Sequence, residues 1–345
     1  MPTLTAPPSL KANHAAGSVA PLQNLVACHA ALVAEIGKTI VGQQNVIHNV
    51  LLTIYCGGHA LIVGVPGLEK TLLISALGKS LDLSCSRIQF TPDLMPSDIT
   101  GTEIIAEDPA TGKRRLEFLP GPVFANLILA DEINRTPPKT QAAMLQTMQE
   151  REVTVGTKTY PLPAPFHVFA TQNPIEMEGT YVLPEAQADR FMFSIHCTYP
   201  TNAEEEQVVR NTTGVEVPQC VPVLNAAQIV EIQKLVRAVP VSDEVVRYAV
   251  KLVSRTRPED PASPKYVKEF VRWGASPRAS QYLVLGAKAH AALSGGLCAD
   301  YEGVRAVARQ VLSHRILTNF HARAQKKTAL EIIELLLKEV RPGGA

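Results

Sequence analysis

Two stretches decide the fold of this chain: Gly64-Val65-Pro66-Gly67-Leu68-Glu69-Lys70-Thr71, and Leu127-Ile128-Leu129-Ala130 running into Asp131-Glu132. The first lies between two apolar runs, residues 60–63 and 72–74, which places it at a predicted strand-to-helix turn. A glycine-rich turn at such a place directs backbone N–H groups and a helix N-terminus toward an anion. The sequence therefore predicts a phosphate-binding loop.

The second stretch predicts the acidic half of the same site. Asp131 ends an apolar strand, and open α/β sheets bind ligands at the carboxyl ends of their strands. We expect Asp131 to hold Mg²⁺ through water, and Glu132, on the other side of the pleat, to polarise a water that attacks a γ-phosphate. Together the two stretches predict ATP and Mg²⁺ as cofactors and ATP hydrolysis as the reaction.

Within the loop, Lys70 supplies a mobile positive charge and Thr71 a hydroxyl ligand for the metal. The predicted nucleotide contacts are Gly64, Val65, Pro66, Gly67, Leu68, Glu69, Lys70, Thr71 and Leu72. Glu69 departs from the usual pattern, which places a small residue before the lysine. Because a carboxylate near phosphates weakens anion binding, we expect Glu69→Ala to tighten ATP binding, and unchanged affinity would mean that the carboxylate points to solvent.

Length and composition indicate a globular protein of about two domains. The chain has 345 residues, of which 46% are hydrophobic, and no apolar run approaches the roughly 20 residues of a membrane span. Residues 1–20 lack a signal core and are predicted to be a disordered lead. The six cysteines are far apart without a Cys-x-x-Cys pair, which fits a reducing cytoplasm better than a zinc site or a disulfide framework.

Charge is divided unevenly along the chain. The totals are 33 basic and 32 acidic residues, yet residues 1–220 carry 14 basic and 21 acidic ones, and residues 221–345 carry 19 and 11. A basic second half could bind nucleic acid, dock on the acidic half of a neighbouring copy, or be a solvated face. If it docks, the assembly should weaken as salt rises.

Hydrophobic periodicity predicts an α/β domain followed by a helical one. Helices over 21–56 break at residues 41–43, and then strands alternate with helices, which favours a parallel sheet covered on both faces. The predicted strands are 59–64, 86–90, 126–131, 166–172 and 191–197, with helices at 70–81 and 137–151. After Pro200 only helices are predicted, at 202–212, 225–237, 242–256, 278–293, 301–319 and 328–340.

Two irregular segments interrupt the predicted sheet domain. Residues 91–122 are rich in proline and glycine and contain a predicted hairpin between 101–105 and 115–118. Residues 153–162 form a second predicted hairpin around Gly156. A minimal nucleotide-binding domain requires neither hairpin, so both are candidate working surfaces.

The longest motif is Leu129-Ala130-Asp131-Glu132-Ile133-Asn134-Arg135-Thr136-Pro137-Pro138-Lys139-Thr140-Gln141, which resembles the MoxR family of AAA+ ATPases. Four other segments match motifs of this family and occur in the family's order along the chain. They are Gln89-Phe90-Thr91-Pro92-Asp93, Ala170-Thr171-Gln172-Asn173-Pro174, Leu183-Pro184-Glu185-Ala186-Gln187-Ala188-Asp189-Arg190-Phe191 and Ser276-Pro277-Arg278-Ala279. The resemblance covers roughly residues 36–320. It implies a P-loop NTPase (AAA+) domain over 21–200, a helix and linker over 201–223, and a helical lid domain over 224–345.

The resemblance also implies roles for single residues. Asn173 matches sensor 1, Arg190 the arginine finger that reaches a neighbour's nucleotide, and Arg278 the sensor 2 arginine that lies over the phosphates of its own subunit. Val41-Gly42-Gln43 matches the segment that lies against adenine, and Arg135 matches a subunit-interface position. From the bare residues, Asn173 before Pro174 equally fits an Asx turn, Arg190 a surface ion pair, and residues 41–43 a helix break.

An arginine finger that acts on a neighbour implies a homo-oligomer, which in this family is a hexameric ring with both hairpins facing its pore or surface. The family implies a chaperone-like remodeller in the maturation of protein complexes or metal-cofactor enzymes, with a protein client and a von Willebrand A domain partner. Two alternatives are a nucleic-acid motor and a nucleotide-gated scaffold with weak hydrolysis. Neither hairpin has the Lys/Arg and aromatic pattern of strand binding, which makes nucleic acid the less favoured ligand.

Overall fold

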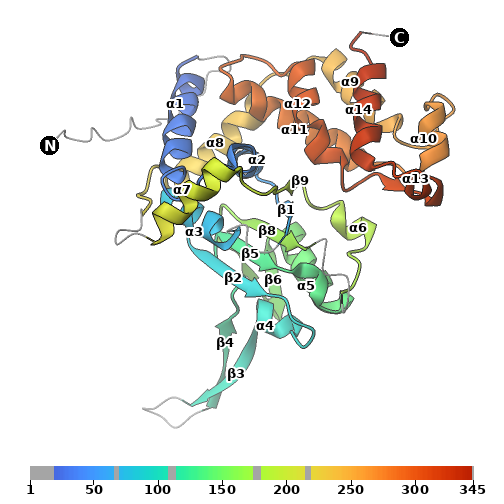
Figure 1. Cartoon of the computed structure of the whole chain (residues 1–345). Helices are drawn as coiled ribbons and strands as arrows, with labels where there is room; N and C mark the ends of the chain where they lie inside the picture. Colours follow the sequence, from blue (N-terminus) through green and yellow to red (C-terminus); the bar gives the residue numbers. More distant parts are fainter. Residues whose placement is uncertain (1–18, 66–69, 108–113, 174–179, 214–218, 344–345) are drawn as a thin grey trace.

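A five-stranded parallel sheet lies at the centre of the first domain (Figure 1). The computed structural model describes residues 19–65, 70–107, 114–173, 180–213 and 219–343. In spatial order the strands are β2 (Cys85–Gln89), β5 (Leu127–Asp131), β8 (His167–Gln172), β1 (Ala60–Val63) and β9 (Phe193–His196). All four pairings are parallel, as the sequence predicts.

Successive side chains of each strand enter two different hydrophobic cores. In β5, Leu129 packs into the core under the N-terminal helices, and Ile128 packs into the core on the opposite face. The helices on the first face are α1 (Val19–Ile36), α2 (Gln44–Tyr55) and α3 (Lys70–Ser80), and α5 (Pro138–Glu150) covers the second. Burial on both faces explains why the inner strands β1 and β5 are almost continuously apolar, whereas the edge strand β2 is mostly exposed and polar.

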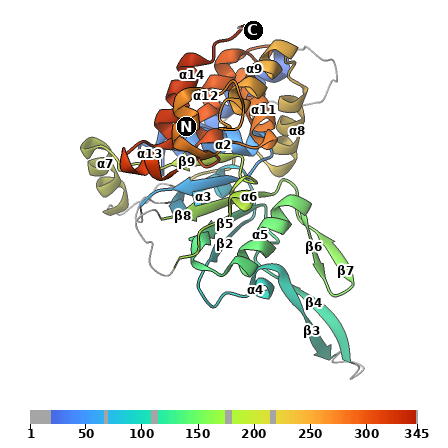
Figure 2. The same ribbon diagram turned by 90° about the vertical axis from the view of Figure 1, so that its right-hand side faces the viewer.

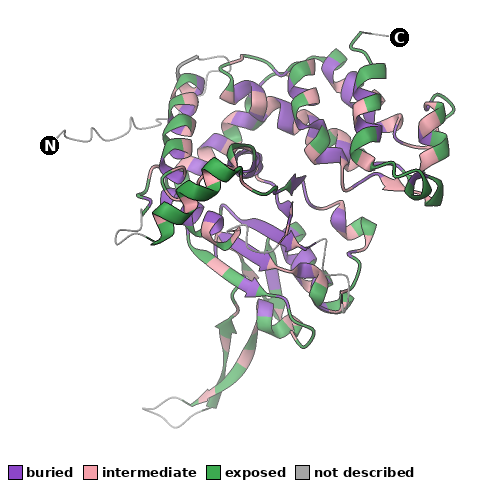
Figure 3. Cartoon of the chain, in the orientation of Figure 1, coloured by how far each residue is buried: buried purple, intermediate pink, exposed green. Residues whose placement is uncertain are grey.

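The helical domain continues the first of these cores, so the two domains share buried apolar residues (Figure 3). Its helices are α8 (Ala226–Ala238), α9 (Asp243–Ser254), α10 (Lys265–Phe270), α11 (Pro277–Leu293), α12 (Tyr301–Leu312), α13 (Phe320–Ala324) and α14 (Ala329–Glu339). The central helix is α11, which packs on α8, α9 and α12. Helix α7 (Asn202–Thr213) lies before this domain in the chain, beyond the edge strand β9.

Two expectations for the helical domain are wrong in detail. No strand was expected after Pro200, but β10 (Val271–Trp273) and β11 (Leu317–Thr318) form a short antiparallel pair. A helix was expected over 301–319, but α12 ends at Leu312. The cause is tertiary, because His314 and Arg315 leave the helix to hydrogen-bond Phe191 and Asp189 of the first domain.

Both predicted hairpins are confirmed. Strands β3 (Gly101–Glu107) and β4 (Arg114–Pro120) follow the short helix α4 (Pro96–Thr100) and form an arm that extends away from the sheet (Figure 2). Strands β6 (Glu152–Val155) and β7 (Lys158–Pro161) form the second hairpin. The two meet where the ring of Phe118 stacks on that of Tyr160, with centroids 4.1 Å apart. They therefore form one joined surface.

Two further features of the structure concern the apolar character of its helices and the state of its cysteines. Within the described ranges, no helix has both the length and the apolar character needed to cross a bilayer. All six cysteines are unpaired, and four of them are buried. The four buried cysteines therefore act as small core residues rather than as crosslinks.

Candidate functional site

The predicted phosphate loop connects β1 to α3 at the carboxyl edge of the sheet. Residues 66–69, which include the predicted contacts Pro66, Gly67, Leu68 and Glu69, lie outside the described residues. At the start of α3, the Lys70 ammonium donates a hydrogen bond to the Gly64 carbonyl at the end of β1. Burial lowers the pKa of Lys70, while Cys197 and the nearby carboxylates of Asp131 and Glu132 raise it. The loop lysine and the acidic pair therefore lie in one electrostatic environment.

Asp131 is held from both neighbouring strands. Its Oδ2 pairs with Arg87 Nη2 of β2 at 2.6 Å, and its Oδ1 accepts a hydrogen bond from the Thr171 hydroxyl of β8 at 2.6 Å. This follows from the strand order, since β5 lies between β2 and β8. The Asp131 carboxylate is thereby fixed at the end of its strand.

Glu132 turns away from the strand direction. We expected it to continue the pleat of β5, but β5 ends at Asp131 and Glu132 adopts the left-handed conformation, with φ 57 and ψ 49. The short η1 (Ile133–Arg135) follows it. The Glu132 N–H donates to the Thr171 hydroxyl at 2.8 Å, so one hydroxyl links both acidic residues. The Glu132 carboxylate accepts from Arg135 Nη1 at 2.8 Å and from Gln89 Nε2 at 3.1 Å.

The side chains at this edge suit Mg²⁺. Asp131, Glu132 and Thr71 offer only oxygen atoms, which Mg²⁺ prefers, and Mg²⁺ keeps several waters when bound in proteins. Both oxygens of Asp131 already accept hydrogen bonds, from Thr171 and Arg87. An ion would therefore meet Asp131 most easily through water, and the metal site itself stays a prediction. Thr71 lies exposed in the first turn of α3.

Asn173 follows β8 directly and is buried, at 8% exposed. Because β8 lies between β1 and β5, Asn173 leaves the sheet between the phosphate loop and Asp131. That is the place expected of a sensor 1 residue, and the role itself stays a prediction.

Arg190 and Arg278 belong to a second cluster, beside the short helix α6 (Glu185–Ala188). The guanidinium of Arg278 pairs with Asp189 Oδ2 at 3.6 Å, and Asp189 is the residue next to Arg190 in the sequence. The side chain of Arg190 donates from Nη1 to the Leu145 carbonyl of α5 at 2.7 Å. The structure thus groups the two arginines at the domain boundary. Their roles at a nucleotide, as finger and as sensor 2 of the same subunit, stay predictions.

The predicted adenine-binding segment, Val41-Gly42-Gln43, forms the confirmed break between α1 and α2. Gly42 and Gln43 both have positive φ, 67 and 53. The positive φ favours glycine at position 42, where an added Cβ would meet only the flexible Glu204 side chain of α7, 2.5 Å from its Oε1. The contact of Val41 and its neighbours with adenine stays a prediction.

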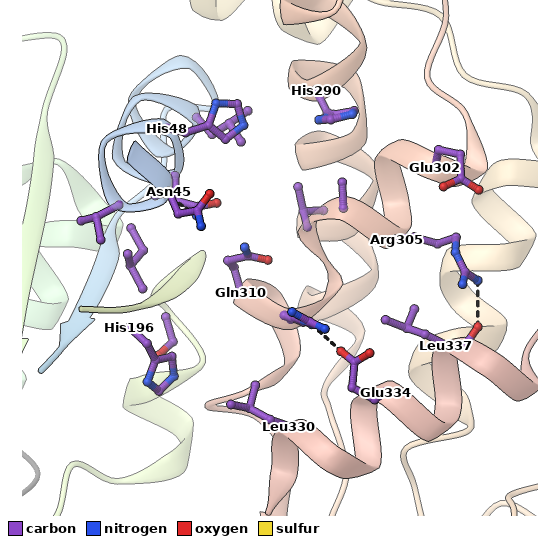
Figure 4. A pocket seen from close by; sticks show the side chains of 18 of the residues that line it. Asn45, His48, His196, His290, Glu302, Arg305, Gln310, Leu330, Glu334 and Leu337 are labelled. Carbon is purple, nitrogen blue, oxygen red and sulfur yellow. Dashed lines mark hydrogen bonds and ion pairs between the residues drawn. The ribbon is translucent and has the colours of Figure 1, made fainter. Parts of the chain in front are cut away.

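A cleft of about 800 Å³ lies elsewhere, between α2, β9, α12 and α14 (Figure 4). His48, His196 and His290 face it, and an ion pair between Arg309 and Glu334 lies along its wall. Among the residues that the structure describes, none of the predicted nucleotide contacts lines it. Within the described ranges, no group of three or more His, Cys, Asp or Glu side chains is arranged to hold a metal.

Sequence reasoning missed several residues that organise the site. Thr171 lies inside a recognised motif, and its hydroxyl near the end of an otherwise apolar strand was the available signal. Arg87 was recognisable only as a charge within a strand, and its pairing with Asp131 depends on strand order. Nothing in the sequence around Arg315 indicates its role, because its partner Asp189 lies far away in the sequence.

Comparison with known proteins agrees with this arrangement. A parallel sheet with a phosphate loop, an acidic pair and a C-terminal helical domain defines the AAA class of ATPases. Residues 59–193 match the ATPase family associated with various cellular activities (AAA), and residues 263–335 match the AAA lid domain. A solved structure of a proposed ATPase from Cytophaga hutchinsonii superposes with a TM-score of 0.87 at 41% identity, covering 94% of this chain and 97% of that one.

Curated relatives narrow the assignment. Chaperone MoxR1 of Mycobacterium tuberculosis is 40% identical over 308 residues, which span 89% of this chain and 80% of the relative. Protein MoxR of Methylorubrum extorquens is 31% identical, over 82% of this chain and 85% of the relative. The chain belongs to the MoxR family of AAA+ ATPases, and the resemblance inferred from its motifs is confirmed.

Proposed function

We propose that this protein binds ATP with Mg²⁺, hydrolyses it, and uses the cycle to remodel client proteins as a chaperone. The observation that carries the proposal is the Thr171 hydroxyl, which holds Asp131 and Glu132 together in the electrostatic environment of Lys70. Any one of the charged residues Asp131, Glu132 and Lys70 alone would be an ordinary surface charge. Together they match the needs of phosphoryl transfer, which are positioning and charge stabilisation.

Each residue has a distinct part in the proposed reaction. Lys70 offsets the negative charge of the transferred phosphoryl group, and Asp131 with Thr71 holds the metal that supplies further positive charge. Glu132 accepts the proton of the attacking water. Asn173 orients that water, and Arg190 of a neighbouring subunit stabilises the charge that develops as the bond breaks.

The Glu132 carboxylate must exchange partners before it can act. Its Oε2 is occupied by Arg135 and Gln89. The Arg135 side chain is 45% exposed, and exposed ion pairs contribute at most about 1 kcal/mol, so rotation away from Glu132 costs little. We infer that an arriving nucleotide, or a neighbouring subunit facing Arg135, releases Glu132 for catalysis.

A ring, in this family a hexamer, follows from the proposed role of Arg190. In the single chain its guanidinium contacts Leu145 of its own α5 instead of the Lys70 region. A site that needs Arg190 from a neighbour is complete only between two subunits. The six unpaired cysteines favour the cytoplasm as the compartment in which this assembly works.

The joined hairpins are the proposed client surface. Ile105 of β3 lies opposite Leu116 of β4, and the two are 70% and 65% exposed. Adjacent exposed apolar side chains on a projecting arm favour protein contacts. The nearby Arg114 and Arg115 are paired with Glu107 and Glu117, which disfavours a nucleic-acid ligand. A von Willebrand A domain protein is the partner expected to bring clients, such as metal-cofactor enzymes, to this surface.

Phosphate release from ATP tests the proposal, with wild type compared to Glu132→Gln. We expect the variant to lose about 100-fold or more in turnover while it still binds ATP, because the amide cannot accept the proton. The matched control is Glu205→Gln, which makes the same change on the exposed surface of α7. Equal turnover in wild type and Glu132→Gln would instead support a nucleotide-gated scaffold.

A further inference from the structure

Residues 189–192, between α6 and β9, are bound by the helical domain at every backbone carbonyl. Arg315 donates to the carbonyls of Asp189, Phe191 and Met192. Tyr282 donates from its hydroxyl to the carbonyl of Arg190 at 3.2 Å. We call this segment with its partners the junction. It includes the backbone of the predicted arginine finger.

Arg315 is the centre of the junction. Its Nε donates to Asp189 Oδ1 at 2.7 Å, its Nη2 to two carbonyls at 2.8 and 2.6 Å, and its Nη1 to Met192 at 3.2 Å and to Val311. A guanidinium has five N–H groups, so every one is used. The residue is 5% exposed. A buried charge with all donors satisfied tolerates little displacement, since any shift leaves part of it unpaired.

Two further side chains of the helical domain complete the junction. The ring of Tyr282 lies beneath the Arg315 guanidinium, 5.1 Å from its centroid, so Arg315 also fixes the side chain that holds Arg190. His314 donates from Nε2 to the Phe191 carbonyl at 3.1 Å. The backbone of residues 189–192 is thus attached to α11 and to the turn after α12, rather than being a free loop.

The carboxylate of Asp189 joins the same network to the start of α11. Ser276, the N-cap of α11, donates its hydroxyl to both Asp189 oxygens, at 2.9 and 2.8 Å. Arg278, in the first turn, pairs with Asp189 Oδ2. A movement of α11 therefore pulls on Asp189 as well as on the carbonyl of Arg190.

We propose that Arg315 and Tyr282 are positioning residues for Arg190. They fix the backbone of the arginine finger to the helical domain, so that the finger and this domain move as one body. A shift of the helical domain in one subunit then repositions Arg190 at the nucleotide of the next. The inference rests on the proposed function, because Arg190 is taken to act on ATP bound by a neighbour.

A double-mutant cycle separates positioning from plain structural support. Tyr282→Phe removes one hydroxyl and keeps the ring beneath Arg315. We expect it to lower kcat about three- to tenfold, the range for one lost hydrogen bond, without a change in KM. In an Arg190→Ala background the same change should have no further effect. The matched control is Tyr301→Phe, which removes a hydroxyl that donates to Glu244 on the surface of the same domain.

Amide hydrogen exchange of a peptide covering residues 185–193 gives a readout that does not depend on hydrolysis. Without nucleotide, Tyr282→Phe and Arg315→Lys should raise its exchange rate, and Tyr301→Phe should leave it unchanged. Unchanged exchange in Arg315→Lys would overturn the inference, as would an equal loss of kcat from Tyr282→Phe with and without Arg190. A wild type that exchanges as expected but has no turnover would overturn the proposed function alone and leave the attachment of the segment supported.

Discussion

Two regions of the molecule hold an aspartate with an arginine, and they do so in opposite ways. At the carboxyl edge of the sheet, Asp131 pairs with Arg87, whose side chain is 52% exposed. At the junction, Asp189 pairs with Arg315, whose side chain is 2% exposed. The arginine of the first pair lies in water and can exchange partners cheaply, whereas the arginine of the second is buried and cannot, although the two aspartate side chains are similarly covered, at 16% and 19% exposed.

The two regions therefore meet different structural requirements. At the sheet edge, metal and nucleotide must be able to displace the cations that hold Asp131 and Glu132 in the free chain. Pairs whose arginine is exposed, such as Arg87–Asp131 and Arg135–Glu132, allow this. At the junction the requirement is the reverse. The arginine finger, Arg190, needs a backbone held in a fixed position if it is to act on a neighbour's nucleotide.

The largest effect should come from the buried arginine. Arg315→Met leaves Asp189, at 19% exposed, without its main partner and removes hydrogen bonds to four backbone carbonyls, so the free energy of unfolding should fall by about 3–5 kcal/mol. The exposed Arg309, paired with Glu334 on α14, gives a matched control. Arg309→Met should cost less than about 1 kcal/mol. Urea unfolding of both variants measures the contrast, and similar losses would remove the distinction between the two kinds of pair.

Acid should also weaken the boundary between the two domains, progressively with each pH unit. Burial lowers the pKa of His167 to about 4 and, helped by Arg315, lowers that of His314 well below 6.5. Both rings are bonded across the boundary, His167 by Gln233 of α8 and His314 to Phe191. They are neutral when folded, whereas the unfolded chain binds protons below pH 6.5.

Stability should therefore be level above about pH 7 and fall as pH drops from 6.5 toward 4, by about 1.4 kcal/mol per pH unit for each histidine. Urea titrations at several pH values measure the slope. The variant His167→Gln, which cannot be protonated, should reduce it. A slope that His167→Gln leaves unchanged would show that this ring does not set the acid response.

A smaller effect is expected at the exposed region. Thr171→Val removes the hydroxyl that links Asp131 and Glu132 but keeps the β-branched shape that suits β8. We expect turnover to fall about tenfold and stability by about 1 kcal/mol, the value of one hydrogen bond. Thr171→Ser is the matched control, because it keeps the hydroxyl. Phosphate-release assays would contradict the account if the valine and serine variants were equally active.

Sequence alone predicted the parts of this molecule that depend on local pattern. The parallel strands and both hairpins follow from apolar periodicity and turn residues. The end of the helix predicted over 301–319 was wrong, because His314 and Arg315 bond to a segment more than 120 residues earlier. No local pattern encodes that partner.

The same limit applies to the candidate site. Arg87 reaches Asp131 only because β2 and β5 are neighbours in space, and Thr171 serves both acidic residues only because β8 lies on the other side of β5. Strand order is a property of the whole sheet. The motifs therefore name the candidate residues, and the structure gives what holds Asp131 and Glu132 in place.

If Arg190 of a neighbouring subunit completes each nucleotide site, two variants that are inactive alone should be active when they are mixed. Lys70→Ala removes the phosphate-loop cation and keeps Arg190, and Arg190→Ala does the reverse. Assembled alone, each should hydrolyse little ATP. Co-assembled, they should recover turnover, because Arg190 of one subunit meets Lys70 of the next. A mixture no more active than the two variants measured separately would contradict the claim.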